Sequence, residues 1–470
     1  MSQAVEPRRG WPLTVKIVLF LLALVLLVLT GAWLQRKPIA ADILGREISA
    51  RGVTASYRIT RLGFRNQRLE NIVIGDPANP DLTADWAEVL VSLRWGGVTV
   101  RKITARGVRL NGRIVGGKLR LGQIDRLLLP PSGKPFAFPD FEVDIDRTRI
   151  SLATSAGRVS LALRGRGKLS DGFRGRLAGS APRIALGAGC RGTGVRANVA
   201  LTIDRRSPHI SGPVSAALVD CPASEIRAAR LSIVVDARLP EALNRWRGGA
   251  RLGIETLEVA RGAASGLAGN VRFDGDADLT LGVLDVIAQR ARFAEHFGRR
   301  LRFDGRYRVQ PRQARIALLG DVALGDLALG RAIRAALTTT LLSAAGTPIE
   351  PLGRAAASAV QRATQSIDLL GSLKLVHGPR GGGARLQPLT ARSASGARLA
   401  VAGGEGLTYY WPQRLLRIDG EASLQGGDFP IARIAFDQPR PGGPISGVLR
   451  VAPRCASARE AGPAPASTPW

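Results

Sequence analysis

Apolar and polar residues alternate with a period of two over most of this chain, which limits the fold more than any other feature. The alternation is clear at residues 87–95, 141–145, 159–163, 195–203, 231–239 and 271–283. Successive side chains of a strand point to opposite faces, so each run predicts a strand with one apolar face. The 56 Gly among 470 residues also disfavour a helical fold. We predict a mainly β protein: an elongated, curved antiparallel β-sheet with a few short helices.

Dipeptides that favour positive φ lie between these runs and predict hairpin turns. The alternation also changes phase twice, between Val100 and Ile103 and between Ile145 and Ile150. Such changes indicate β-bulges, which would curl the sheet. The predicted turns are Asn111-Gly112, Asp171-Gly172, Asp274-Gly275, Asp304-Gly305 and Asp419-Gly420.

A few segments have helical rather than strand spacing. A short helix is expected at 40–51 and a longer one at 284–300, which has a basic end. Residues 330–345 and 354–370 predict a helical hairpin, interrupted by Gly346, Pro348 and Pro351. The alternation resumes at Leu373.

The N-terminus carries an apolar, uncharged run of 18 residues from Ile17 to Leu34. This is close to the roughly 20 residues that cross a bilayer as a helix. Trp11 and Trp33 flank it, as interfacial aromatic residues do. We expect an uncleaved transmembrane anchor; the alternative is a signal peptide cleaved after small residues near Ala32. Positive charges on both flanks leave the orientation open, although the short basic leader favours export of the remainder.

These observations divide the chain into six parts. We expect a cytoplasmic leader at 1–16, the transmembrane anchor at 17–34 and a β-rich groove region at 35–283. A mixed helical and β insert at 284–372 and a β-rich continuation at 373–451 follow. The Pro/Ala/Ser-rich tail at 452–470 is expected to be disordered.

The formal net charge of +30 first suggests nucleic acid as a partner. The arginines, however, alternate with apolar residues along strands and lack the interleaved aromatic residues that stack on bases. They form a cationic polar face that would suit anionic lipid headgroups, although arginine richness can also reflect genome composition. Nucleic acid is therefore not an expected partner.

No strong catalytic or cofactor motif occurs: HExxH, GxxxxGK[ST], GxSxG and CxxC are all absent. The three His residues are isolated. Asp274, Asp276 and Asp278 resemble the start of a calcium loop, but Leu279 replaces the required Gly. A hairpin turn plus one solvated strand face is therefore the preferred interpretation. Glu142, Asp144 and Asp146 share one strand face, which favours solvation over acid–base chemistry. We expect no catalytic residue, no metal and no cofactor.

Cys190 and Cys221 flank a predicted pair of strands. In an oxidising compartment they could form a disulfide, and otherwise they are two free buried thiols. Cys455 lies in the tail.

Three segments carry a family resemblance. They are RITRLGFRNQRLENIVIGDP at Arg58–Pro77, ADWAEVLVSLRWGGVTVRKITARGVRLNGRIVGGKLRLG at Ala84–Gly122, and ARSASGARLAVAGGEGLTYYWP at Ala391–Pro412. Together with the N-terminal anchor, they resemble the AsmA-like superfamily, and most of all its YdbH branch. The motifs are structural, and they specify architecture better than mechanism. Members of this branch are commonly much longer.

The resemblance implies an inner-membrane protein of the Gram-negative envelope, single-pass with its bulk in the periplasm. It further implies a rolled sheet with an apolar interior that moves phospholipids toward the outer membrane, alongside TamB and YhdP. The expected partners are phospholipids and the inner membrane, with outer-membrane or periplasmic proteins as further candidates.

The residues themselves support such a groove. A sheet with one apolar face must cover it, and with few amphipathic helices a curved sheet could shelter the face itself. The alternative for each position is an ordinary packed core. The expected lining residues are Val89, Val91, Leu93, Val108, Leu110, Phe141, Val143, Ile145, Val159, Leu161, Leu163, Leu231, Ile233 and Val235.

Two other functions are kept open. The protein could be an envelope structural or assembly factor that binds biogenesis partners through its β-surface. It could also be a membrane-tethered enzyme, which a cleft with convergent carboxylates would favour.

Overall fold

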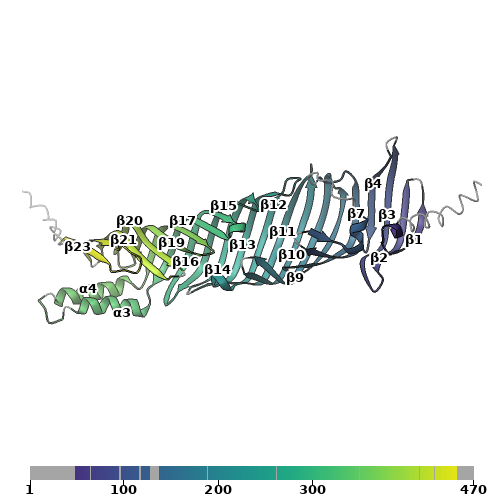
Figure 1. The fold of residues 1–470 in the computed structure, drawn as a ribbon. Helices are drawn as coiled ribbons and strands as arrows, with labels where there is room; N and C mark the ends of the chain where they lie inside the picture. The colour runs from purple at the N-terminus through teal and green to yellow at the C-terminus, as the bar shows by residue number, and fades with distance from the viewer. Residues whose placement is uncertain are drawn as a thin grey trace, which may run out of the picture. The chain divides into compact units, whose positions relative to one another are not determined.

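The structure is a computed structural model that describes residues 48–452, apart from residues 64, 95–96, 116–117, 128–136, 188, 261, 344, 349, 412 and 428. Strands dominate it, as the alternation predicts (Figure 1). The chain divides into two compact units. Unit 1 runs to Gly179 and includes Leu201–Arg206; unit 2 comprises Ser180–Ala200 and the chain from Ser207.

The predicted transmembrane helix at Ile17–Leu34 and residues 453–470 of the tail lie outside the described residues. Within the described part, no helix combines the length and apolar character that crossing a membrane requires. Of the short helix expected at 40–51, the structure describes residues 48–50 as helical.

Unit 1 is built from a strand order that departs from a simple meander. Strands β1, β2, β3 and β4 pair as antiparallel neighbours. Strand β7 then pairs in parallel with β4 and with β5, and antiparallel with β8. The strands and the 3₁₀ helix are β1 Ala55–Leu62, β2 Asn66–Asp76, β3 Asn79–Arg94, β4 Gly97–Arg106, β5 Arg109–Val115, β6 Lys118–Arg120, η1 Gly122–Arg126, β7 Glu142–Thr154 and β8 Gly157–Lys168.

Unit 2 is an antiparallel meander in which each strand from β11 to β23 pairs with the next. Strands β9 (Asp171–Gly187) and β10 (Cys190–Asp204) have residues in both units. The remaining elements are β11 Ser207–Cys221, η2 Pro222–Ser224, β12 Ile226–Arg238, β13 Arg245–Val259, β14 Gly262–Asp276, β15 Thr280–Phe293, β16 His296–Gln310, η3 Pro311–Gln313, β17 Arg315–Ala328, α3 Arg331–Leu342, α4 Glu350–Ala363, β18 Ile367–Gly378, β19 Gly381–Ser393, β20 Arg398–Trp411, β21 Leu415–Gly426, β22 Phe429–Asp437 and β23 Ser446–Ala452.

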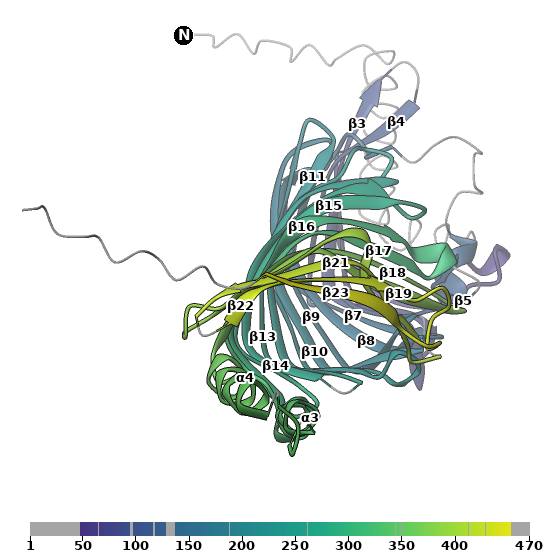
Figure 2. The ribbon, with the colours of Figure 1, turned by 90° about the vertical axis from the view of Figure 1, so that its left-hand side faces the viewer.

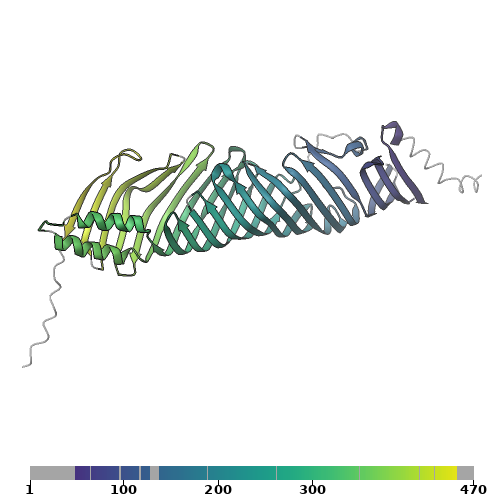
Figure 3. The same ribbon diagram turned by 90° about the horizontal axis from the view of Figure 1, so that it is seen from below.

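The helix predicted at residues 284–300 is wrong. These residues complete β15, turn at Ala294-Glu295 and begin β16. Leu284, Val286 and Ala288 all have partners on β16, so pairing with the neighbouring strand overrides the local helical spacing. The helical hairpin at 330–370 is confirmed as α3 and α4, which lie side by side (Figure 3), although α4 ends earlier than expected.

Most predicted Asp-Gly and Asn-Gly turns are also wrong. Asn111-Gly112, Asp274-Gly275, Asp304-Gly305 and Asp419-Gly420 lie inside strands, and Asp171-Gly172 begins β9. In the Asp304-Gly305 pair, the close approach of two strands explains why a Gly lies inside a strand. Gly305 and Gly320 are opposite each other, and a Cβ added to Gly320 would lie 2.4 Å from the Gly305 Cα. Any side chain there would force the strands apart.

Both predicted phase changes are confirmed. The register of β3 with β4 shifts between Leu90 and Val91, because Lys102 and Val100 are their partners and one residue is skipped. The register of β7 with β8 shifts between Ile145 and Thr148. Arg147, inside the second shift, has a left-handed backbone with φ 52°. Each shift restores the apolar residues to their original face.

The packed cores of the two units are small. In unit 1, Val143, Phe173 and Ile203 are buried together and packed by Phe138 and Phe141. In unit 2, α4 packs on strand ends: Ala359 and Ala363 meet Ala397 and Phe429. No large side chain of the described residues is fully buried.

Candidate functional site

The main candidate site is one face of the sheet in unit 2. Directly opposed residues of β11–β18 form three continuous rows that contain no charged side chain, and we call these rows the apolar face. The rows are Ile210–Ala237–Gly248–Phe273–Gly282–Tyr307–Leu318–Leu375, Gly212–Val235–Ala250–Val271–Leu284–Gly305–Gly320–Leu373 and Val214–Ile233–Leu252–Gly269–Val286–Phe303–Val322–Gly371.

The intervening positions of the same strands form the outer face, which is strongly polar. Two of its rows are Pro213–Val234–Arg251–Asn270–Asp285–Asp304–Asp321–Ser372 and Ser211–Asp236–Gly249–Arg272–Val283–Arg306–Leu319–Lys374.

The two faces differ in exposure even where they carry the same residue type. On the outer face, Val283 is 40% exposed and Leu319 is 58% exposed. On the apolar face, Val286 and Leu318 are half-buried. The helices do not explain the difference, because α3 packs on α4 and α4 packs on strand ends. A single layer shelters one face more than the other only if it curves toward that face, and Figure 2 shows the strands of unit 2 bending.

An aromatic ring fills the space beside a glycine on the apolar face. Tyr307 lies opposite Gly282, and its ring occupies the space that a Gly282 side chain would need. The Tyr307 hydroxyl donates to the carbonyl of Arg272 at 3.1 Å, so the one polar group in the rows has a partner. Burial raises the pKa of Tyr307 above its usual value.

The predicted lining residues fall into two groups. Ile233 and Val235 belong to the apolar face, and Leu231 lies in the adjoining row between Ala216 and Ile254. The other eleven are in unit 1.

In unit 1, the register joins some of these residues directly. Val89 and Val143 both pair with Ile103, and Leu110 and Leu161 both pair with Ile150. The others have these neighbours: Val91 pairs with Val100, Ile145 with Ala105 and Gly165, Val159 with Leu152, and Leu163 with Thr148, while the Val108 carbonyl accepts from the Arg149 N–H.

Three of the predicted residues in unit 1 differ from the half-buried remainder. Val143 is buried in the aromatic cluster and Phe141 packs against it, so both take part in a closed core. The Leu93 side chain lies outside the described part of the chain. The remaining predicted residues are half-buried.

No lining residue was predicted on β13–β18, so Leu252, Val286, Phe303 and Val322 were missed, although a strand with one apolar face was predicted at 271–283. A signal was present at 301–309, where Leu301, Phe303, Tyr307 and Val309 alternate with charged residues.

Carboxylates predicted to be solvated do lie on exposed faces beside basic groups. Glu142 is 3.5 Å from the Lys102 ammonium, and Asp144 is 2.9 Å from the Arg106 guanidinium. Asp146 lies 3.9 Å from Arg147. These ion pairs point to a structural role for the three acids.

Of the calcium-like aspartates, Asp274 lies within β14, and Asp276 and Asp278 lie at the turn that leads into β15. The backbone N–H groups of Leu279 and Asp278 donate to Asp276, which lowers the pKa of Asp276. Asp274 and Asp278 each lie 2.6 Å from an arginine. Among the described residues, no group of three or more His, Cys, Asp or Glu side chains has the arrangement of a metal site.

The remaining sequence candidates have structural contacts. The sulfur atoms of Cys190 and Cys221 are 2.12 Å apart, which places a disulfide between the ends of β10 and β11. His296 accepts from the Gly330 N–H, and His377 accepts from the Trp411 indole.

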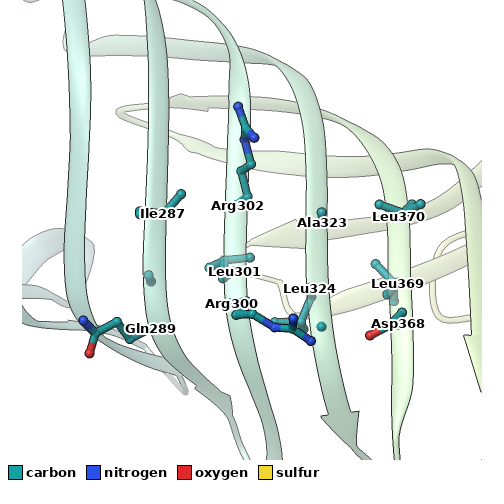
Figure 4. Close-up of a pocket in the computed structure, with 12 residues that line it drawn as sticks. Ile287, Gln289, Arg300, Leu301, Arg302, Ala323, Leu324, Asp368, Leu369 and Leu370 are labelled. Carbon is teal, nitrogen blue, oxygen red and sulfur yellow. The ribbon is translucent and has the colours of Figure 1, made fainter. Parts of the chain in front are cut away.

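The outer face carries a shallow hollow of about 540 Å³ over β15–β18 (Figure 4). Its side chains include the exposed Ile287 and Leu370, at 51% and 58% exposure, beside Arg302. Arg302 lies 3.5 Å from Asp285. This hollow is on the opposite face from the predicted groove and combines apolar and charged groups.

The fold and the face define a class of protein: a β-sheet protein with a long, uncharged, sheltered surface that suits acyl chains rather than a reacting group. A family model described as YdbH-like, intermembrane phospholipid transport protein YdbH, matches residues 23–454. The chain therefore belongs to the YdbH-like family of intermembrane phospholipid transport proteins, which is not an enzyme family. No curated protein and no solved structure matches the chain.

Proposed function

We propose that this protein carries phospholipids between the inner and outer membranes along the apolar face of its sheet. In this proposal Ile17–Leu34 anchors the chain in the inner membrane, and the strands lie in the periplasm as a groove. Acyl chains rest on the apolar face while headgroups stay in water. Family membership supports the substrate class, and the apolar face supports the route.

The observation that carries the proposal is the uncharged apolar face. Its three rows cross β11–β18 without a charge, and the main backbone contacts of these strands are with their sheet neighbours. Each acyl methylene removed from water contributes about 0.8 kcal/mol. A gap in the apolar surface would therefore release a chain into water, and an unbroken surface lets a lipid move from strand to strand at nearly constant free energy.

We include in the proposed lipid-binding surface the half-buried residues of unit 1 that were predicted to line the groove. Val89, Ile145, Val159, Leu161 and Leu163 are half-buried on strands that also alternate apolar and polar residues. We leave Val143 out of the proposed lining because it is packed in a closed core.

The test uses two valines of β15 that differ in face. We expect Val286→Arg to lower the phospholipid that copurifies with the full chain by at least about tenfold, because it places a charge among acyl chains. Val283→Arg, on the outer face, is the matched control and should leave the lipid content unchanged. Bound lipid is measured by mass spectrometry. Equal loss in both variants, or none in Val286→Arg, would contradict the proposal.

One observation favours a second function, an envelope assembly factor. The outer-face hollow exposes Ile287 and Leu370, a surface that could hold a protein partner. If partner binding were the main function, Ile287→Ser with Leu370→Ser would impair the protein in cells without changing its bound lipid.

A further inference from the structure

A second hollow, of about 670 Å³, lies where β14, β15, β16 and β17 approach their ends in unit 2. Three arginines gather around it: Arg290, Arg292 and Arg299. Phe297, which is 57% exposed, lies among them. The other lining residues are Thr256, Ala263, Ala264, Ser265, Ala291, Gly298, Asp326, Ala328, Gln365 and Ser366.

The strand register fixes how these groups meet. Arg290 lies directly opposite Arg299, and Arg292 lies opposite Phe297. The row of Arg290 continues through Ser265 to Thr256, so the Ser265 hydroxyl lies directly beside Arg290 and the Thr256 hydroxyl lies one strand further away. Cβ atoms of opposed residues are about 4.5–5.5 Å apart, which makes like charges repel.

A change of phase places these arginines on the exposed side. Arg300 has a left-handed backbone with φ 54°, and so does Gly266 on β14 with φ 64°. Beyond them Ala291 and Gly298 take the sheltered positions, while Arg290 and Arg299 are exposed. The hollow therefore belongs to the side opposite the apolar face.

The three arginines have no ion pair with an acid in the described part of the chain. Many neighbouring arginines of the sheet do: Arg247 lies 2.6 Å from Asp274, for example. The one carboxylate in the lining, Asp326, is already bound by Arg300 at 3.1 Å. The Ser366 hydroxyl also donates to Asp326. The hollow thus keeps an uncompensated positive charge.

We propose that this hollow binds a phosphate group. Guanidinium groups bind phosphate oxygens through paired, charge-assisted hydrogen bonds, and the hydroxyl of Ser265, opposite Arg290, can donate to a further oxygen. A bound phosphate would also relieve the repulsion between Arg290 and Arg299. The phosphate could come from a phospholipid headgroup or from free phosphate. The inference stands apart from the transport proposal, because it concerns the other face.

The test measures binding to the full chain held in phosphatidylcholine nanodiscs, by titration calorimetry with two probes. The probes are dihexanoyl phosphatidylglycerol and inorganic phosphate. The variant Arg290→Gln with Arg299→Gln removes the opposed pair. Arg392→Gln with Arg398→Gln is the matched control, because these two arginines are also exposed and directly opposed but lie outside the hollow.

We expect the 290/299 variant to weaken binding of the short-chain lipid by at least about tenfold and the 392/398 variant to leave it within about twofold. The same loss for inorganic phosphate would assign the site to phosphate from either source, and binding of the lipid alone would assign it to a headgroup. Equal losses in the two variants, or no loss in either, would overturn the proposal. Arg290→Lys with Arg299→Lys keeps the charge and should bind with intermediate affinity, which separates site loss from misfolding.

Discussion

The two faces of β11–β18 share the same backbone yet have opposite chemistry. On the apolar face, valines and leucines such as Val286 and Leu318 are half-buried. On the outer face, Val234, Val283 and Leu319 are 40%, 40% and 58% exposed among arginines and aspartates. The comparison teaches that curvature alone can create an apolar surface that is both protected from bulk water and open to a ligand. A second layer of secondary structure would have protected the face and closed it.

The difference in shelter between the two faces is tested most strongly by placing the same charge on each face of β12. Ile233→Asp removes a half-buried side chain and buries a carboxylate, and we expect it to lower the free energy of unfolding by about 3–5 kcal/mol. Val234→Asp, one residue along and 40% exposed, should change it by less than about 0.5 kcal/mol. Denaturant unfolding measures both. Similar losses would mean that the two faces are equally sheltered.

Removal of the disulfide should lower the stability of the fold without changing lipid binding. Cys221→Ser opens a loop with a sequence separation of 31 residues and should cost about 3 kcal/mol. Because neither cysteine belongs to the apolar face, the bound phospholipid should not change. A shift in non-reducing gel mobility that disappears in the variant would establish the bond. Absence of the shift in the unaltered protein would show two free thiols.

The close approach of two strands at Gly320, on the apolar face, predicts a loss of stability that is similar to or smaller than that of the disulfide variant. Gly320→Val places a side chain against the backbone of Asp304 and Gly305, and we expect a loss of about 1–3 kcal/mol. Ala268→Val adds bulk at an exposed position paired with Ile287 and should be nearly neutral. Thermal unfolding of the two variants compares them. A stable Gly320→Val protein would show that the strands can separate there without cost.

The smallest expected effect concerns pH. Burial raises the pKa of Tyr307, so its neutral form stabilises the folded state fully below the unfolded pKa of about 10. This contribution is lost as pH rises through the higher folded pKa. Stability should therefore fall above about pH 10, and fall less in Tyr307→Phe. Ultraviolet titration of the four tyrosines should show one fewer late phenolate in that variant.

Much of this fold follows from the sequence. The alternating runs, the helical hairpin and both bulges could be predicted, because side-chain periodicity reports local conformation and burial together. The turns could not. Several hairpins turn at residues such as Arg205-Arg206 and Ala294, whose positive φ values no residue preference would suggest. Gly305, which was predicted to form a turn, instead allows two strands to approach closely.

The candidate site was foreseen only in part. Ile233 and Val235 were predicted because β12 alternates cleanly. Val286 was missed because residues 284–300 have helical spacing, and only pairing with β16 decides between helix and strand. Val143 alternates like its neighbours, yet Phe173 and Ile203, which are distant in sequence, are buried with it. Periodicity identifies an apolar face but does not tell whether the face is open or packed.

The most direct test of the central claim is photo-crosslinking from the two faces of β15. Benzoylphenylalanine replaces Val286 or Val283 in the full chain, and crosslinked phospholipid is detected by mass spectrometry. The account predicts a lipid adduct at position 286 and none, or far less, at position 283. Equal labelling at both positions, or labelling only at 283, would contradict a lipid route along the apolar face.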